Sequence, residues 1–170
     1  MRIDDSGTFV EYWRGVRQRT RRLLPVAPAD RLEWEIAPGR WTLGDLFRHL
    51  AAIERWMYGE NVQGRPSRYP GHGRDLADGP EAVGEYLDRM HEESCAIFGA
   101  LTPEQLAGKS VTPAGTPITT FKWLRAMVEH EAHHRGQISL LLGLLDVKVP
   151  QIFGLTEEEV RARSAASPPG

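Results

Sequence analysis

The sequence predicts an all-α protein whose helices form a four-helix bundle, and three observations lead to this fold class. Four long segments carry apolar residues at three- and four-residue spacing, which is the period of an amphipathic helix. Strand-like alternation is absent over any useful length, and the chain has no internal repeat. A length of 170 residues with 41% hydrophobic side chains suits one domain with a buried core.

The first two helices are predicted from proline and capping signals. The first runs from about Thr8 to Leu24, and Pro25 and Pro28 end it because proline lacks the backbone N–H that a helix needs. The second begins near Thr42, where Thr42-Leu43-Gly44-Asp45 resembles a capping box with Asp in place of the usual Glu. Its apolar face carries Leu46, Phe47, Leu50, Ile53, Trp56 and Met57.

A long connection separates the second helix from the third. It runs from Gln63 to Pro80 and is dense in Gly and Pro, and a crossover between helices that do not run antiparallel would explain its length. The third helix spans about Pro80 to Leu101, with proline in its first turn, and Thr102-Pro103 ends it. A second connection, Gly108 to Pro117, leads to the fourth helix at about Ile118 to Leu145.

The C-terminal part follows a turn through Pro150. We expect a short helix from Thr156 to about Arg163 and assign residues 1–163 to a single helical domain. The remaining tail, 164–170, is expected to be disordered because it has too few apolar residues to pack.

Composition and charge exclude several classes of protein. The formal net charge is −2, from 21 basic and 23 acidic side chains, which gives no electrostatic footprint for nucleic acid or an anionic membrane. The single cysteine, Cys95, can form no intramolecular disulfide and is expected to be a buried residue without an activating partner. The N-terminus is not expected to act as a signal peptide, because it is acidic and has few apolar residues. The longest apolar stretch, Ile138 to Leu145, is far shorter than a membrane span. We therefore expect a cytoplasmic protein that binds neither nucleic acid nor membrane.

Three histidines form the candidate metal site. His130 and His134 are four residues apart, so on a helix they project from one face with Cβ atoms about 5–6 Å apart and can reach one cation. His49 lies between Leu46 and Ile53 at spacings of three and four, on the core side of the second helix. If the two helices are neighbours, the three imidazoles meet at a similar depth.

The same stretch matches the zinc-protease pattern His130-Glu131-x-x-His134, in which the glutamate activates a metal-bound water. The extended pattern needs a further Gly and His downstream, and the chain does not provide them. No predicted sheet edge could hold an extended peptide. We therefore disfavour a protease. We expect Glu131 either to be solvated or to contact a metal ligand without binding the ion itself.

Neighbouring residues on the fourth helix have more than one possible role. Gln137 follows His134 by three residues and either orients an imidazole or a metal-bound water or is a partly exposed polar residue. His133 is either a surface residue or a second such group. Gly136 lowers the stability of a helix interior by about 1 kcal/mol relative to Ala. We expect the close approach of a neighbouring helix to compensate for this loss. Four aromatic residues could line a cavity above the metal, namely Trp41, Trp56, Trp123 and Tyr58. Aromatic residues at helical spacing are more typical of a core, so these four are left out of the site.

The segment from His130 to Gln137 resembles the fourth-helix signature of the DinB-like, or YfiT-like, superfamily, where a histidine pair precedes Arg-Gly-Gln. The stretch from Trp41 to Leu50 is similar to that superfamily's first metal-ligand helix, which typically ends in His-Leu. The resemblance covers about Thr8 to Leu145. It implies an up-down-down-up bundle with one divalent metal ion on the same three histidines, and it is compatible with a homodimer.

A metal-dependent enzyme is the function that the resemblance implies. Three histidine ligands leave a coordination position open, as in catalytic rather than structural zinc sites. The superfamily includes bacillithiol- and mycothiol-dependent transferases and proteins described as metal-dependent hydrolases. We therefore expect a thiol-dependent S-transferase or a hydrolase that acts on a small molecule, with a low-molecular-weight thiol as one candidate partner. Zinc and nickel are the first candidates for the ion, followed by iron and manganese. The alternative is a non-catalytic bundle that binds metal or a ligand for stability or sensing.

Overall fold

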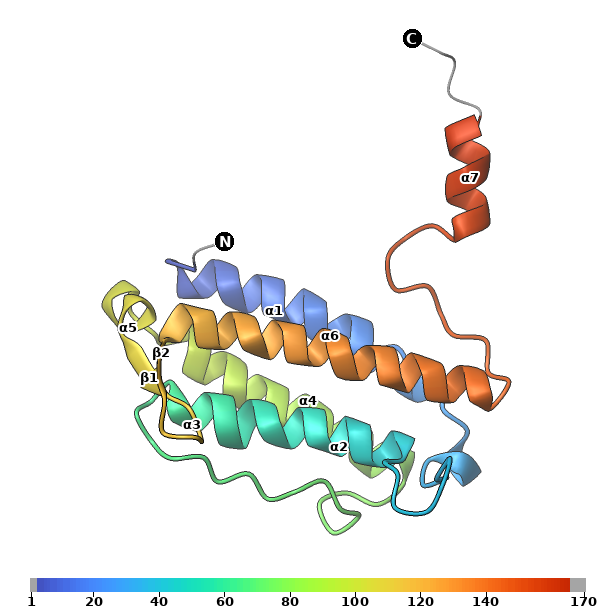
Figure 1. Cartoon of the computed structure of the whole chain (residues 1–170), viewed down its shortest axis with the longest axis horizontal. Helices are drawn as coiled ribbons and strands as arrows, with labels where there is room; N and C mark the ends of the chain where they lie inside the picture. Colours follow the sequence, from blue (N-terminus) through green and yellow to red (C-terminus); the bar gives the residue numbers. More distant parts are fainter. Residues whose placement is uncertain (1–2, 166–170) are drawn as a thin grey trace.

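Four long helices lie side by side in the computed structural model, which describes residues 3–165 (Figure 1). They are α1 (Ser6–Arg21), α2 (Leu43–Ile53), α4 (Gly79–Gly99) and α6 (Thr120–Leu144). α1 and α6 run in one direction and α2 and α4 in the other, which is the up-down-down-up order (Figure 1). α1 and α2 each pack against both α4 and α6, so the four helices close into a ring. The predicted all-α bundle is confirmed.

Side-chain caps set where the helices begin. The Asp5 carboxylate accepts a hydrogen bond from the backbone N–H of Thr8 at 2.6 Å, which starts α1 two residues before the predicted boundary. The predicted capping box is present, because Thr42 and Asp45 each accept a hydrogen bond from the other's backbone N–H. α1 ends at Arg21, earlier than expected, and two short 3₁₀ turns, η1 (Leu24–Val26) and η2 (Ala29–Arg31), follow it.

The second helix continues beyond α2 through a π-helical turn, η3 (Glu54–Tyr58), into α3 (Gly59–Asn61). From α3 the chain returns along the outside of the bundle to the start of α4 (Figure 1). α4 runs parallel to α2, so the long connection is needed to bring the chain back to the same end.

The link between α4 and α6 differs from the prediction. A one-turn helix, α5 (Pro103–Ala107), follows a capping box at Thr102, where the sequence predicts only a helix end. A small antiparallel hairpin then pairs β1 (Lys109–Val111) with β2 (Pro117–Thr119). These strands have three residues each, too few for a period-two pattern to stand out in the sequence, and β2 takes the first residues expected for α6.

A polar layer divides the apolar core into two clusters. The first cluster includes Phe47, Leu87 and Leu142, and the second includes Trp13 and Leu124. Between the two clusters, α1, α2, α4 and α6 contribute the buried polar side chains of Arg17, His49, His91 and Glu131, and η3 contributes that of Glu54. Buried charges are expensive unless they are paired, and here Arg17 pairs with both Glu54 and Glu131.

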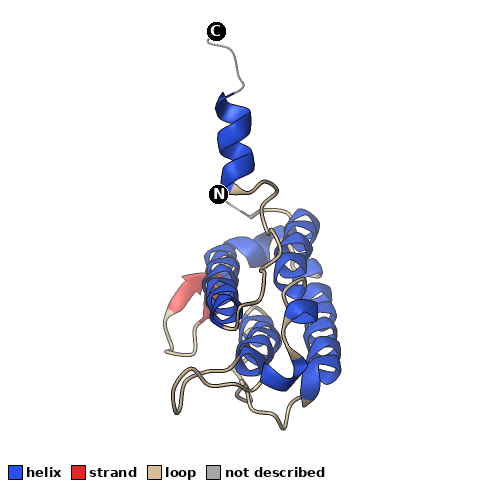
Figure 2. Ribbon diagram, turned by 90° about the vertical axis from the view of Figure 1, so that its right-hand side faces the viewer, coloured by secondary structure: helices blue, strands red, loops and turns tan. Residues whose placement is uncertain are grey.

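The chain leaves the bundle after α6. α7 (Glu157–Ala165) extends away from the four helices and buries none of its side chains (Figure 2). It ends two residues beyond the predicted boundary, so positions 164 and 165 of the expected tail are helical. Residues 166–170 of that tail lie outside the described part of the chain. Within residues 3–165, no helix is both long enough and apolar enough to span a bilayer.

Candidate metal centre

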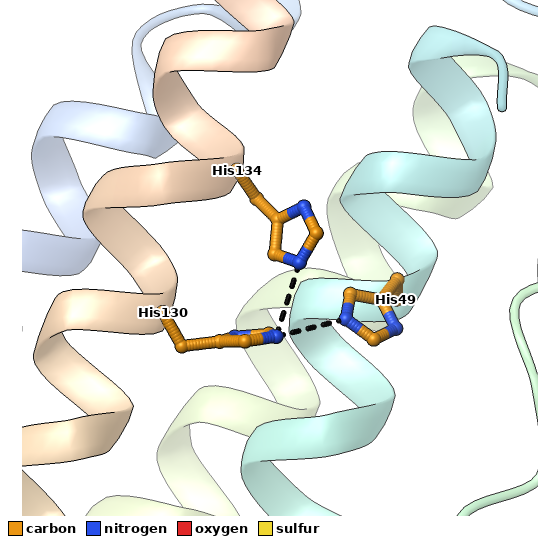
Figure 3. A group of neighbouring side chains, drawn as sticks. All are labelled: His49, His130 and His134. Carbon is orange, nitrogen blue, oxygen red and sulfur yellow. Dashed lines mark hydrogen bonds between the residues drawn. The ribbon is translucent and has the colours of Figure 1, made fainter.

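The three predicted ligands meet across the gap between α2 and α6. His49 projects from α2, and His130 and His134 project from successive turns of α6 (Figure 3). The Nε2 atom of His130 lies 3.1 Å from Nε2 of His49 and 3.0 Å from Nε2 of His134. One nitrogen from each ring falls within 4.8 Å of the other two. Tetrahedral metal–nitrogen bonds of about 2.0–2.1 Å place neighbouring nitrogens about 3.3–3.4 Å apart, so both contacts are within about 0.4 Å of the separation that an ion requires.

Hydrogen bonds at the Nδ1 atoms, on the side of each ring away from the cluster, orient two of the imidazoles. Nδ1–H of His134 donates to Oε1 of Gln137 at 2.6 Å, which leaves the Nε2 lone pair of His134 facing the cluster. Nδ1 of His49 lies 2.7 Å from the hydroxyl of Tyr69, and that hydroxyl lies 3.3 Å from Nδ1 of His72. When His49 donates to Tyr69 and Tyr69 donates to His72, the Nε2 lone pair of His49 faces the cluster as well. Such outer hydrogen bonds are a regular feature of histidine metal ligands.

The donor set fits a cation better than a hydrogen-bond network. With these hydrogen bonds, the Nε2 atoms of His49 and His134 both present lone pairs to Nε2 of His130, which carries one proton at most and can donate to one of them. The other short contact is then a lone-pair repulsion that a bound cation would relieve. Protonation cannot supply the charge at neutral pH. Burial and the neighbouring rings lower the pKa of His49 to about 3, and burial together with His134 lowers that of His130 to about 4.

Aromatic residues from two loops cover the cluster. The Trp41 ring stacks on His134 with its centroid 5.7 Å away and an interplanar angle of 11°. It also lies 4.8 Å from the His49 ring and 4.2 Å from the His72 ring. Trp41 is therefore part of the site, and the prediction that placed it outside the site was wrong. Tyr69 and His72 come from the long connection, where no periodic pattern singled them out.

Arg48 ties both loops to the helix that carries His49. Its guanidinium is completely buried and donates to Glu33 at 2.7 and 2.8 Å and to Asp45 at 2.9 Å. It also donates to the backbone oxygens of His72 at 2.7 Å and Ala77 at 3.2 Å. Glu33 belongs to the segment that leads to Trp41, whereas His72 follows Tyr69 in the long connection. One side chain next to His49 therefore positions both covering loops.

Comparison with known proteins assigns the chain to a family. The model of the DinB superfamily matches residues 12–138, which include all three histidines. The chain belongs to the DinB superfamily.

Several proteins are similar to this chain at low sequence identity. The chain is 25% identical over 154 residues to the uncharacterized protein YrdA of Bacillus subtilis strain 168, with 89% of each chain covered. A crystal structure of a DinB-like protein from Bacillus cereus ATCC 10987 matches with a TM-score of 0.68 at 23% identity. It covers 85% of this chain and 95% of its own. The DinB-like protein YjoA of Bacillus subtilis also matches with a TM-score of 0.68, at 18% identity over 85% of this chain and 96% of its own. At these identities the two structures support the fold and leave the activity open.

His133 lies outside the cluster in this DinB-superfamily structure. It is exposed on α6, and its ring centroid is 5.0 Å from that of His134. In the described part of the chain it makes no hydrogen bond to any of the three clustered histidines. The geometry favours the surface role for His133 and the orienting role for Gln137.

Two other expectations for α6 were wrong. Glu131 is neither solvated nor directed at the cluster, because it is buried on the α1 side of α6 and pairs with Arg17 at 3.2 Å. Burial raises the pKa of Glu131 against the opposing pull of Arg17. Gly136 has no neighbouring helix against it, since it is exposed and a Cβ built there meets nothing within 4 Å. The sequence signal was misleading in both cases because it does not show which side of the helix the neighbours cover.

A second group of potential ligands lies inside the polar layer. Glu54, His91 and Cys95 bring one potential donor atom each within 4.8 Å of the other two. Glu54 is already engaged, since it accepts hydrogen bonds from Trp13 at 2.6 Å and His91 at 2.9 Å and pairs with Arg17. Burial and the Glu54 charge raise the pKa of Cys95 to about 12, which keeps the thiol protonated, as expected for a buried unreactive cysteine. A divalent cation there would lie beside the buried Arg17 charge, so the three-histidine cluster is the better metal site.

Proposed function

We propose that this DinB-superfamily protein is an enzyme that uses one divalent metal ion, held by His49, His130 and His134, to act on a small molecule. The observation that carries the proposal is the convergence of three imidazole nitrogens. Nε2 of His130 lies within 3.1 Å of Nε2 of both His49 and His134. Because Nε2 of His130 can donate a proton to only one of these two neighbours, a cation fits this position better than hydrogen bonds do.

The protein's own side chains would act as ligands and supports. The three imidazoles are neutral at physiological pH because their pKa values are lowered, so their lone pairs are available to an ion. Gln137 and Tyr69 hold His134 and His49 in the required orientation. A divalent ion bound to three neutral ligands keeps its full charge, and it would lower the pKa of a water or thiol that it coordinates. Zinc and nickel are our first candidates.

Two features favour catalysis over a purely structural ion. Structural zinc sites are usually closed by four protein ligands, whereas three ligands leave room for a substrate. A cavity of about 490 Å³ also borders His134, which is a typical volume for a small-molecule site. Thiol transfer is the first activity to test and hydrolysis the second. This order rests on analogy with other members of the superfamily.

Metal analysis of matched variants tests the ligand assignment. Wild-type protein loaded with zinc and then desalted is expected to retain one ion per chain, and His134→Ala is expected to lose it. His133→Ala is the control, because it removes an adjacent exposed imidazole. Retention of zinc by His134→Ala, or equal loss in both variants, would show that the ligands are wrongly assigned.

Turnover separates an enzyme from a non-catalytic metal protein. The zinc- and nickel-loaded proteins are incubated with a chlorinated aromatic electrophile and bacillithiol, mycothiol or glutathione, and separately with activated esters. A rate above that of the metal-free protein supports catalysis. If no substrate is turned over and removal of the ion lowers the unfolding temperature by many degrees, the ion is structural.

A further inference from the structure

The cavity beside His134 has an unusual lining. It lies between the segment that leads to Trp41 and the C-terminal half of α6. Leu140 and Leu144 continue the α6 face that carries His134, and Ile36 and Trp41 form the opposite wall. Of these, Leu140 is 65% exposed and Ile36 and Leu144 are each 50% exposed. Three large aliphatic side chains are thus held in solvent around one hollow next to the metal centre, so an apolar occupant would gain from covering them.

A positive charge stands at the edge of the same cavity. Arg40 lines it, and within the described part of the chain its side chain has no salt bridge or hydrogen bond to the protein. Its backbone is held in a tight turn, because the Arg40 N–H donates to the oxygen of Ala37 at 3.0 Å. Gly39 occupies this turn with φ +74°, and its N–H donates to the Glu35 carboxylate at 2.8 Å. The turn therefore fixes where the Arg40 side chain starts and leaves its guanidinium available to an anion.

We propose that the substrate is a small amphipathic acid with three parts. These are a head that binds the metal ion, an apolar body about the size of a hexyl or phenyl group, and a carboxylate that pairs with Arg40. The head lies at His134, the body contacts Ile36, Trp41, Leu140 and Leu144, and the carboxylate lies at the rim. This inference rests on the proposed metal-dependent function and adds the substrate class to it.

Three hydroxamates of graded structure test each part on the zinc-loaded protein. Acetohydroxamate supplies only the metal-binding head, octanohydroxamate adds an apolar chain, and the monohydroxamate of octanedioic acid adds a terminal carboxylate. Affinities are measured by isothermal titration calorimetry. A fully buried methylene is worth roughly fourfold in affinity, so partial burial of six methylenes should make octanohydroxamate bind at least about tenfold more tightly than acetohydroxamate. The carboxylate should add a further gain of about threefold or more, because it pairs with an arginine at the cavity rim.

Variants separate the apolar part from the charged part. Leu140→Ser should reduce the gain from the alkyl chain about threefold or more. Val111→Ser, at another exposed aliphatic residue, which lies on β1 outside the cavity, should not change it. Arg40→Gln should abolish the gain from the carboxylate and leave the affinity for octanohydroxamate unchanged. Each variant should retain its zinc, which is measured alongside.

The outcomes distinguish this inference from the proposed function. A wild-type protein that holds zinc but binds the three hydroxamates equally would overturn the substrate class alone. A carboxylate gain that survives Arg40→Gln would overturn the role of Arg40. A wild-type protein that holds no zinc would overturn the proposed function itself.

Discussion

Replacement of Arg48 by methionine should destabilise the protein by about 3 kcal/mol. Methionine replaces the aliphatic part of the side chain and keeps the helix propensity, but it is shorter than arginine and removes the charge and every donor. Removal of one partner from a buried ion pair costs about 3–5 kcal/mol, because the other partner stays behind without its counter-charge. Here Arg48 is completely buried, but the side chains of Glu33 and Asp45 are 25% and 20% exposed and can be partly rehydrated. The expected loss is therefore at the lower end of this range.

Urea unfolding followed by far-ultraviolet circular dichroism measures this loss. The metal-free protein is used, so that zinc binding does not contribute to the apparent stability. Arg74→Met is the matched control, since Arg74 pairs with Asp78 on the surface, where the side chains are 62% and 60% exposed. Such exposed pairs contribute about 0–1 kcal/mol. The zinc affinity of Arg48→Met should also fall, because the loops that carry Trp41 and Tyr69 lose their common anchor.

A loss below about 1 kcal/mol for Arg48→Met would refute the reasoning, because it would place the cost below that of a single buried unsatisfied group. An equal loss in Arg74→Met would refute it as well, since burial would then not be the cause.

Four further predictions follow from the site and its surroundings. Tyr69→Phe removes the hydroxyl that orients His49 and should weaken zinc binding about 10- to 100-fold in a competition assay with a chelator, with the circular dichroism spectrum unchanged; an unchanged affinity would remove Tyr69 from the site. Gly136→Ala fills open space on an exposed helix and should raise the free energy of unfolding by about 1 kcal/mol in urea; a loss of stability would indicate a contact that the structure does not contain. The metal-free protein should lose stability as the pH falls from 6.5 towards 4. His49 and His130 have pKa values of about 3 and 4 in the folded protein, so the unfolded chain binds protons at these residues first. The same pH dependence of unfolding in a variant with both His49→Gln and His130→Gln would contradict this. Cys95 should react with a thiol reagent only after unfolding, since its pKa is about 12 in the folded protein; rapid labelling of the native protein would contradict this.

Local signals predicted most of the fold and part of the candidate site. The capping box at Thr42 and the spacing of His130 and His134 depend on residues three or four positions apart, which a helix brings together whatever surrounds it. The apolar neighbours of His49 placed it on the inward face of its helix. The short hairpin was missed, because three-residue strands carry too little pattern to detect.

Residues that act across long sequence separations could not be predicted in this way. Tyr69 reaches His49 from 20 positions away, and Arg48 reaches the His72 backbone from 24. These contacts join segments without a repeating pattern, so no residue spacing announces them. Trp41 was set aside for the same reason, since stacking on His134 depends on how the loop folds over α6.

The amino-acid sequence by itself determined that the chain forms a helical bundle and which imidazoles project inward from two of its helices. Helical periodicity is a local property, and burial of the apolar faces is sufficient to select the fold. Only the tertiary structure decided that the three imidazoles converge, which loops cover them, and that Glu131 faces Arg17 instead of the metal centre. These facts depend on which helices are neighbours and how they are rotated against each other, and packing in three dimensions sets both.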